Sequence, residues 1–401
     1  MKQAYIVDGI RTPIGSFGGT LSGVRADDLA AMVIKELMKR NSSVPTDTVD
    51  DVILGCVNQA GDDNRNVARM ALLLAGLPYT VPGETVNRLC ASGMSAIVQA
   101  ARAINNGDGD IFIAGGVEHM TRGPGVISKT SKPFGTDAKM YDSSFGWRFV
   151  NLQMEKMYGV DAMGVTAENL AEKYNISRAE QDEFAYQSQI KAAKANQNGR
   201  LAEEIMPIEI ADKKSTIVFS EDEFMKPATT VEGLAKLKAS FKKENGTVTA
   251  GNASGLNDGA AAVLIVSEDA LKKYNLVAKA KIISSAVVGC EPRIMGIGPV
   301  EATKKALAKA GLTLNDIDVI ELNEAFAAQS IACIKELGLQ NNDARINLNG
   351  GAIALGHPLG MSGARILYSA ALELKKQNKK YALATMCIGV GQGYAVVIES
   401  A

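Results

Sequence analysis

The chain has 401 residues, with 43 Lys and Arg against 44 Asp and Glu, and 46% of its residues are hydrophobic. This length is enough for a full hydrophobic core in two or three domains, and the composition excludes disorder throughout the chain. A charge near neutrality gives no reason to expect a nucleic acid or an anionic membrane surface as a partner. No apolar run reaches the roughly 18 residues of a membrane span and no signal-peptide profile is evident, so we expect a cytoplasmic protein without a membrane partner.

The first 120 residues alternate short apolar strands with amphipathic helices. We predict strands over 3–8, 50–57 and 110–116, and helices over 26–40 and 66–76. Strands that alternate with helices in this way predict an α/β fold with parallel strand pairing.

Residues 121–250 differ in character, and we predict that they form an inserted, mostly helical subdomain. The helices predicted over 163–174 and 177–199 are strongly charged, and Ser177 with Glu180 has the spacing of a capping box. From residue 251 the α/β rhythm resumes.

The later part of the chain repeats the earlier part at an offset of 267 residues. The triplet Gly-Met-Ser at 93–95 recurs at 360–362, and the strand that starts near Asp51 recurs near Asp318. In both copies the triplet opens a predicted helix, which indicates duplicated α/β halves.

The five cysteines, at positions 56, 90, 290, 333 and 387, are odd in number and widely spaced, which argues against a disulfide framework. The histidines are only two, His119 and His357, so no metal site is expected. Glycine is in excess, with 39 residues, and many of them fall near His357 and Cys387. Glycine-rich loops beside His357 and Cys387 would allow a ligand to approach the backbone closely.

Cys90 and His357 occupy equivalent positions in the two halves, since the same offset separates them. Cys90, in NRLCASGM, directly precedes a predicted helix whose N-terminal N–H groups would favour a reactive thiolate. The alternative is a small buried hydrophobe, as most free cysteines are. His357, in GHPLGMSGAR, is either a reactive base or an ordinary loop residue.

Cys387 and Asn323 are the other candidates. Cys387 precedes a glycine-rich turn and is either an acid/base group beside an oxyanion site or a core residue. Asn323, in VIELNEAF, lies where a strand ends and either caps the next helix or contacts a ligand at the carboxyl edge of the sheet. The small-residue loop at 249–262 is either a turn or the wall of a long binding site, and Cys56, Cys290 and Cys333 are expected to pack in the core.

Together with IVDGIRTPIGSFGGTL near the N-terminus, these motifs resemble the signatures of the thiolase family, in family order and over essentially the whole chain. The resemblance implies an α/β thiolase fold, with duplicated βαβαβαββ halves in a five-layered α/β/α/β/α core and an inserted helical loop domain. We therefore expect a first half at 1–120 and 251–275, the inserted loop domain at 121–250, and the second half at 276–401.

The resemblance also implies a catalytic mechanism. Cys90 would be the nucleophile that carries the acyl group, and His357 would activate it. His357 and a water held by Asn323 would bind the thioester oxygen of the second substrate, and Cys387 would move the proton at the α-carbon of acetyl-CoA. The backbone N–H groups of Cys90 and Gly389 would stabilise the oxyanion. Ping-pong kinetics follow from such covalent capture.

Coenzyme A and acyl-CoA are expected as substrates, with no permanently bound cofactor. The residues that match coenzyme A contacts of the family are Met163, Lys226, Phe241, Ser254 and Phe326. Ala162 and Lys226 depart from the family pattern, which often has histidine and arginine there. His119 is expected to be a structural neighbour of the active site.

Segments such as SSFGWRFVN are more similar to thiolases of the 3-oxoadipyl-CoA type, so we expect 3-oxoadipyl-CoA or a medium-chain 3-oxoacyl-CoA as substrate. A dicarboxylate-derived acyl chain would need a positive partner, for which Arg65, Arg69 and Arg148 are candidates. The alternatives are a biosynthetic acetoacetyl-CoA thiolase, a decarboxylating ketoacyl synthase and a non-catalytic acyl-CoA binding protein. The resemblance also implies a homodimer or homotetramer, with the insertion as the tetramer contact.

Overall fold

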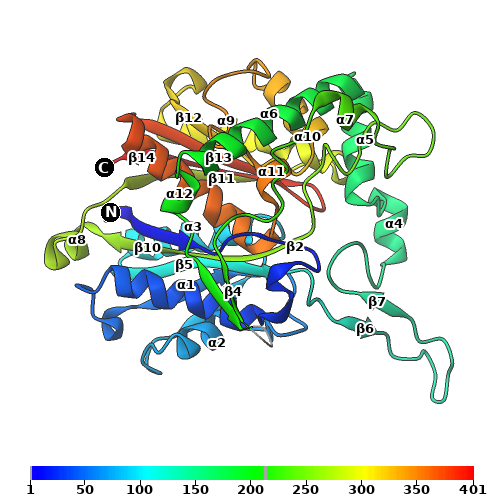
Figure 1. Ribbon diagram of the computed structural model, residues 1–401. Helices are drawn as coiled ribbons and strands as arrows, with labels where there is room; N and C mark the ends of the chain where they lie inside the picture. The colour runs from blue at the N-terminus through cyan, green and yellow to red at the C-terminus, as the bar shows by residue number, and fades with distance from the viewer. Residues whose placement is uncertain (1, 212–214) are drawn as a thin grey trace.

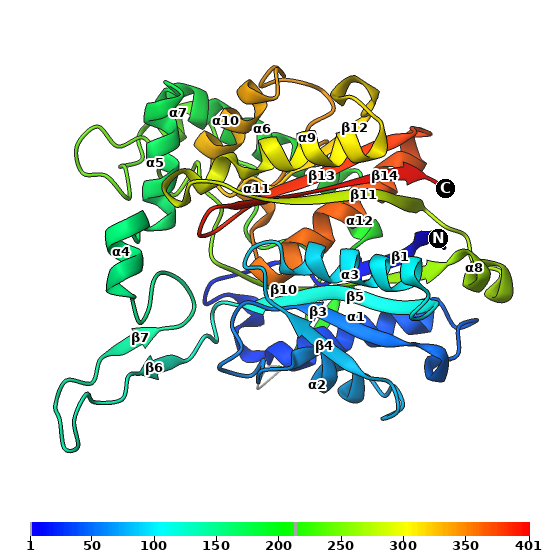
Figure 2. The same ribbon diagram turned by 180° about the vertical axis from the view of Figure 1, so that it is seen from behind.

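The computed structural model describes residues 2–211 and 215–401 and arranges them in five layers (Figures 1 and 2). Helices α3 (Ser92–Asn106) and α12 (Leu359–Gln377) form the central layer between two arms of β-structure. Helix α1 (Ala26–Arg40) covers the outer face of one arm, and α9 (Gly298–Ala310) covers the outer face of the other. Among the described residues, no helix combines the length and the apolarity that a bilayer crossing requires.

Hydrogen bonding between strands continues from one arm to the other, in the order β12-β13-β14-β11-β1-β10-β5-β3-β4. The arms join where β1 pairs with β11, at Tyr5 with Lys281 and Ile6 with Ala280. The strands are β1 (Ala4–Arg11), β2 (Gly15–Ser16), β3 (Asp51–Gly55), β4 (Gly83–Val86), β5 (Ile111–His119), β10 (Asn257–Ser267), β11 (Ala280–Gly289), β12 (Val319–Leu322), β13 (Tyr381–Ile388) and β14 (Gln392–Ser400).

The predicted parallel pairing is confirmed for only part of this structure. Strand β3 pairs in parallel with β4 and β5, and β12 pairs in parallel with β13. The prediction concerned the strands of the first 120 residues, and it was wrong for β1, which pairs antiparallel with β10 and β11. The pairs β5–β10, β11–β14 and β13–β14 are also antiparallel. For β13 and β14 the physical reason is connectivity, since a short turn joins them and short turns join antiparallel strands.

The duplicated halves have nearly the same order of elements. The first half runs β1, α1, β3, α2 (Val67–Leu74), β4, α3, β5 and β10, which is the βαβαβαββ order. In the second half, α10 (Ala327–Glu336) and α11 (Ala352–Leu355) flank a segment in which the third strand is reduced to one parallel bridge between Ile320 and Ile346. The predicted α/β class and duplicated fold are therefore confirmed.

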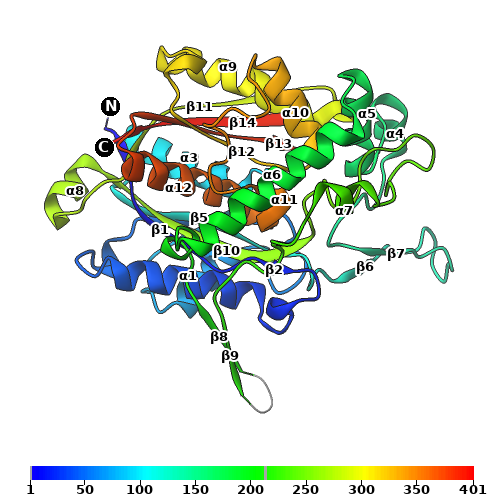
Figure 3. The same cartoon turned by 45° about the horizontal axis from the view of Figure 1, so that its top comes forward.

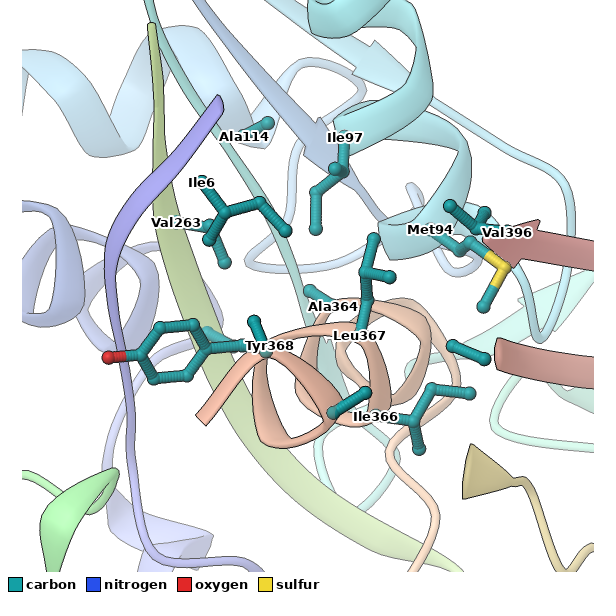
Figure 4. Packing of buried hydrophobic residues seen from close by; sticks show 14 of the residues in the cluster. Ile6, Met94, Ile97, Ala114, Val263, Ala364, Ile366, Leu367, Tyr368 and Val396 are labelled. Atoms are coloured by element: carbon teal, nitrogen blue, oxygen red, sulfur yellow. The ribbon is translucent and has the colours of Figure 1, made fainter. Parts of the chain in front are cut away.

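The two helices of the central layer touch through their backbones. A Cβ atom placed on Gly93 of α3 would lie 2.5 Å from the carbonyl oxygen of Gly360 in α12, and one on Gly363 would lie 2.5 Å from the Met94 nitrogen. No side chain larger than hydrogen fits at these positions. Around this crossing, Met94, Ile97, Ala364 and Leu367 pack in the largest buried cluster (Figure 4).

The segment 121–250 contains helices and also two β-hairpins, which the sequence analysis did not predict. The helices are α4 (Leu152–Tyr158), α5 (Met163–Lys173), α6 (Arg178–Gln197) and α7 (Val231–Ala235). The hairpins are β6 (Gly125–Ile127) with β7 (Met140–Asp142), and β8 (Ile208–Ala211) with β9 (Thr216–Phe219). Both project from the layered core (Figure 3). The predicted capping box of Ser177 and Glu180 is present at the start of α6.

The helix crossing gives a first prediction. Gly93→Ala is expected to lower the free energy of unfolding by about 2 kcal/mol or more, because its Cβ would overlap a backbone atom that cannot rotate away. Urea unfolding followed by circular dichroism measures this change. The matched control is Gly23→Ala, since Gly23 is exposed and a Cβ there meets nothing within 4 Å. Equal stability of the two variants would contradict a close helix contact.

Candidate active site

Cys90 lies in a constrained turn directly before α3. Leu89 adopts a left-handed backbone conformation with φ of 46°, which is uncommon for a branched side chain. The Ser92 hydroxyl secures this turn, since it donates to the Leu89 carbonyl at 2.7 Å and accepts from the Arg88 N–H at 2.8 Å. The thiol is thereby fixed at the helix N-terminus and is partly accessible.

The electrostatics of Cys90 differ from the sequence-based expectation. Burial raises the pKa of the Cys90 thiol, and this effect outweighs the hydrogen bonds from the Gly389 N–H and from its own N–H, which lower that pKa. The N–H groups do favour the thiolate, as expected, but loss of water disfavours the charged form more strongly. Deprotonation of Cys90 therefore needs a base, and the N–H groups of Cys90 and Gly389 both donate toward its sulfur.

One ring nitrogen of His357 is held by Ser362, and the other lies beside Asn323. The Ser362 hydroxyl donates a hydrogen bond to the Pro358 carbonyl at 2.9 Å. It therefore accepts a hydrogen bond from the protonated Nδ1 of His357 at 2.6 Å. Nε2 is then the unprotonated nitrogen. Burial, with a smaller contribution from Arg365, lowers the pKa of His357 to about 3, so the imidazole is neutral at physiological pH.

Asn323 lies beside Nε2 of His357. Its Nδ2 atom is 3.4 Å from that nitrogen, and its side chain is fully buried. The Oδ1 atom has no hydrogen-bond partner among the described residues, so it can accept one from a water or a substrate. Helix α10 begins at Ala327 with Phe326 as its N-cap, so the alternative that Asn323 caps this helix was wrong.

Cys387 is the seventh residue of β13 and is fully buried. Burial raises the pKa of its thiol well above the ordinary value, and Cys90 is the next largest cause. The thiol therefore keeps its proton at rest and can act as an acid toward a nearby carbanion. Gly389 follows in the turn between β13 and β14, and a Cβ there would contact Leu89 at 3.4 Å. The structure thus brings Cys387 and Gly389 to the Cys90 turn.

The predicted coenzyme A contacts gather at the rim of this site. Met163, the first residue of α5, lies 3.8 Å from the Cβ position of Gly389. The rings of Phe241 and Phe326 pack edge to face, with their centroids 6.3 Å apart. Ser254 donates its hydroxyl to the Ala325 carbonyl at 3.1 Å, next to Phe326.

Lys226 lies further out on the same rim. Its ammonium group stands 5.5 Å from the ring centre of Phe224, and that ring packs where a Cβ of Gly255 would lie. Lys226 is therefore next to the Ser254 loop but makes no contact with the reactive groups in the hydrogen bonds of the described residues. Its exposed ammonium group can pair with a phosphate group but is not placed to take part in making or breaking bonds.

His119 is buried, and both of its ring nitrogens have partners. Nε2 donates to the Leu21 carbonyl at 3.0 Å, and Nδ1 accepts from the Arg122 N–H at 3.3 Å. Asp258 lies 3.3 Å from Nδ1. Among the described residues, no group of three or more His, Cys, Asp or Glu side chains is placed to hold a metal ion.

Three polar residues of the site were missed by the sequence analysis. Asn257 accepts the backbone N–H of His357 at 2.9 Å, Ser362 sets the imidazole tautomer, and Glu118 accepts the Gly360 N–H at 2.9 Å. Burial raises the pKa of Glu118 to about 7. Ser362 was detectable as the helical residue five positions after His357, and Asn257 lies in the small-residue loop already singled out. Glu118 has no signal in the sequence beyond its place at the end of an apolar strand.

Comparisons with known proteins give the family of the chain. Family models described as the N-terminal and C-terminal domains of thiolase match residues 4–269 and 276–400. The chain belongs to the thiolase family. It is 58% identical over 400 residues to a beta-ketoadipyl-CoA thiolase of Acinetobacter baylyi, and 56% identical over 400 residues to a 3-oxoadipyl-CoA/3-oxo-5,6-dehydrosuberyl-CoA thiolase of Escherichia coli. Each match covers 100% of both chains.

Solved thiolase structures share the fold over the full length. The acetyl-CoA acetyltransferase of Bacillus anthracis superposes with a TM-score of 0.93 at 42% identity, and human mitochondrial 3-ketoacyl-CoA thiolase with 0.92 at 43%. Both comparisons cover 100% of this chain and 99% of the other. The thiolase is therefore an acyltransferase that uses coenzyme A substrates, and the predicted family and enzyme class are confirmed.

The raised pKa of Cys90 and the neutral imidazole predict how the thiol reacts. The rate of Cys90 alkylation by iodoacetamide should rise about tenfold per pH unit between about pH 6 and 8, because only the thiolate reacts. Mass spectrometry of the labelled peptide follows Cys90 separately from buried Cys387. A rate that is already constant from about pH 5 upward would indicate a preformed thiolate–imidazolium pair and contradict this assignment.

Ser362→Ala should lower kcat by about tenfold to a hundredfold with little change in KM for coenzyme A. The variant removes the acceptor that keeps the proton on Nδ1 of His357, so Nε2 is no longer reliably the free nitrogen. Steady-state kinetics and a thermal unfolding curve separate catalysis from stability. Ser369→Ala is a matched control, since Ser369 lies on the same helix and bonds Glu204 instead. A loss of the same size in both variants would contradict a role in setting the tautomer.

Proposed function

We propose that this thiolase cleaves 3-oxoadipyl-CoA with coenzyme A, to give acetyl-CoA and succinyl-CoA, and catalyses the reverse Claisen condensation. The main support is that curated relatives 54–58% identical over essentially the full length carry the name of beta-ketoadipyl-CoA or 3-oxoadipyl-CoA thiolases. The structural neighbours with other acyl-CoA names are more distant, at 42–43% identity. A second thiolase relative, a 3-ketoacyl-CoA thiolase of Pseudoalteromonas translucida, is 48% identical.

The first half-reaction, in this proposal, begins when Nε2 of His357 takes the Cys90 proton. The Cys90 sulfur attacks the 3-oxo carbon, and the N–H groups of Cys90 and Gly389 hold the oxygen that becomes negative. The bond between C2 and C3 then breaks, leaving a succinyl thioester on Cys90 and the enolate of acetyl-CoA. The His357 imidazolium and a water held by Asn323 stabilise the enolate oxygen, and the Cys387 thiol protonates its carbon.

The second half-reaction restores every proton. The thiol of the incoming coenzyme A gives its proton to the Cys387 thiolate and attacks the acyl carbon. The departing Cys90 sulfur takes its proton back from His357, so the enzyme returns to its starting state. Two displacements on one covalent intermediate give ping-pong kinetics. Met163, Ser254, Phe241 and Phe326 would line the pantetheine arm, and Lys226 would face a phosphate.

We also propose a homodimer or homotetramer in the cytoplasm, with residues 121–250 as an inserted loop domain that forms the tetramer contact. Its β6–β7 hairpin exposes large apolar side chains, which favours an interface there: Ile127 is 66% exposed and Met140 75%. Free thiols on all five cysteines favour a reducing compartment. The two halves would be residues 1–120 with 251–275, and 276–401.

A substrate panel tests the proposed function. The kcat/KM for thiolysis of 3-oxoadipyl-CoA should exceed that of acetoacetyl-CoA by about tenfold or more, and Cys90→Ser should lose on the order of a thousandfold in kcat with either substrate. Cleavage is followed by loss of absorbance of the 3-oxoacyl-CoA enolate. Equal or better turnover of acetoacetyl-CoA would support the biosynthetic alternative instead, and full activity of the serine variant would contradict the acyl-cysteine mechanism.

A further inference from the structure

A loop formed by residues 143–149 is attached to two segments that adjoin the active site. At one end, the Ser143 hydroxyl accepts a hydrogen bond from Nδ2 of Asn58 at 3.0 Å. At the other end, the Trp147 indole donates to the Asp161 carbonyl at 3.2 Å, two residues before Met163. Because both ends are attached to side chains or backbone of other elements, the loop has a defined path between them.

Each attached segment is also hydrogen-bonded to, or in contact with, residues near the reactive groups. The N–H of Asn58 donates to Glu118, whose carboxylate also accepts the Gly360 N–H in the first turn of the His357 helix. The neighbouring Val57 carbonyl accepts from Asn87, three residues before Cys90. Met163, near the other end, lies against the Cβ position of Gly389. The loop at 143–149 is therefore linked through Asn58 and Glu118 to the helix that follows His357, and through Asp161 to the segment that leads into α5.

Arg148 is the cation of this loop. Arg148 is half-buried, and its Nη1 donates to the Ser143 carbonyl at 3.0 Å. The other N–H groups of its guanidinium make no hydrogen bond to the described residues. Among the described residues, no carboxylate lies within ion-pair distance of it, whereas Arg122 and Arg293 on the adjoining segments are paired with Asp62 and Asp161. A partly buried arginine with free N–H donors and no acidic partner is well suited to a ligand that carries a negative charge.

The other candidate arginines are placed differently. Arg69 donates to the carbonyls of Val81 and Tyr79, so its guanidinium is occupied by the main chain of that loop. Arg65 is exposed and sits in a left-handed turn with φ of 62°. Neither is tied to the loop between Asn58 and Asp161.

We infer that Arg148 binds the terminal carboxylate of a dicarboxylic 3-oxoacyl-CoA and thereby selects this substrate class. The inference rests on the proposed function, since only a substrate such as 3-oxoadipyl-CoA carries that carboxylate. A guanidinium with free parallel N–H groups matches a carboxylate in a two-point, charge-assisted contact. A neutral acyl chain of the same length leaves the charge unpaired, so the same residue also discriminates against simple fatty acyl chains.

The test compares two substrates of equal chain length, 3-oxoadipyl-CoA and 3-oxohexanoyl-CoA, with Arg148→Gln, Arg148→Lys and wild-type enzyme. Arg148→Gln should lose about a hundredfold in kcat/KM with 3-oxoadipyl-CoA, mostly through KM, and less than about threefold with 3-oxohexanoyl-CoA. Arg148→Lys should retain part of the preference, since it keeps the charge but loses the two-point geometry. Transfer of labelled acetyl groups from acetyl-CoA to Cys90 should be the same in all variants, which shows an intact catalytic centre.

Arg65→Gln is the matched control, because it removes the same charge from an exposed position. It should leave the ratio of the two kcat/KM values unchanged. Wild-type enzyme that cleaves 3-oxohexanoyl-CoA as well as 3-oxoadipyl-CoA would overturn both the proposed substrate and the role of Arg148. Wild-type preference for 3-oxoadipyl-CoA that survives in Arg148→Gln, or that is lost in Arg65→Gln instead, would overturn the role of Arg148 alone.

Discussion

The backbone contact between α3 and α12 determines where the reactive groups of this enzyme meet. Cys90 precedes one helix and His357 precedes the other, and the helices cross at Gly93 and Gly360, three residues beyond each reactive side chain. A crossing at side-chain distance, typically 8–10 Å between axes, would separate the two N-terminal ends by additional ångströms. The glycines therefore act on catalysis through geometry, although neither touches a reacting atom in the proposed mechanism.

Burial in this central layer has a second consequence, since it keeps the resting groups neutral. The pKa of Cys90 is raised and that of His357 is lowered, so the thiol and the imidazole are both neutral at rest. In the proposed mechanism, charge then develops only as the reaction proceeds, and the fixed N–H groups of Cys90 and Gly389 stabilise it. The raised pKa of Cys387 fits the same scheme, because an acid must hold its proton until the enolate forms.

Some features around this site could be predicted from the sequence. The offset of 267 residues predicted that Cys90 and His357 precede equivalent helices, and those helices touch at the repeated glycines Gly93 and Gly360. Asn257 could not be found in this way, since its bond to the His357 backbone joins positions 100 residues apart and depends on how β10 lies in the sheet. The direction of the shift in the Cys90 pKa could not be predicted from the sequence either, because desolvation is a property of the packed tertiary structure.

Chemistry and substrate choice are carried by different parts of the chain. All 3-oxoacyl-CoA substrates present the same atoms from the thioester to C3, so the duplicated core can treat them alike and has no means to distinguish their far ends. In the proposed assignment, the distinguishing group comes from an element outside the two repeats. The loop at 143–149 is such an element: it belongs to the segment between the repeats, Asn58 of the first half binds its Ser143, and its Trp147 is bound within the segment by Asp161. A substitution in this loop can change the accepted acyl chain without moving Cys90, His357 or Cys387, which is how one fold serves several thioesters.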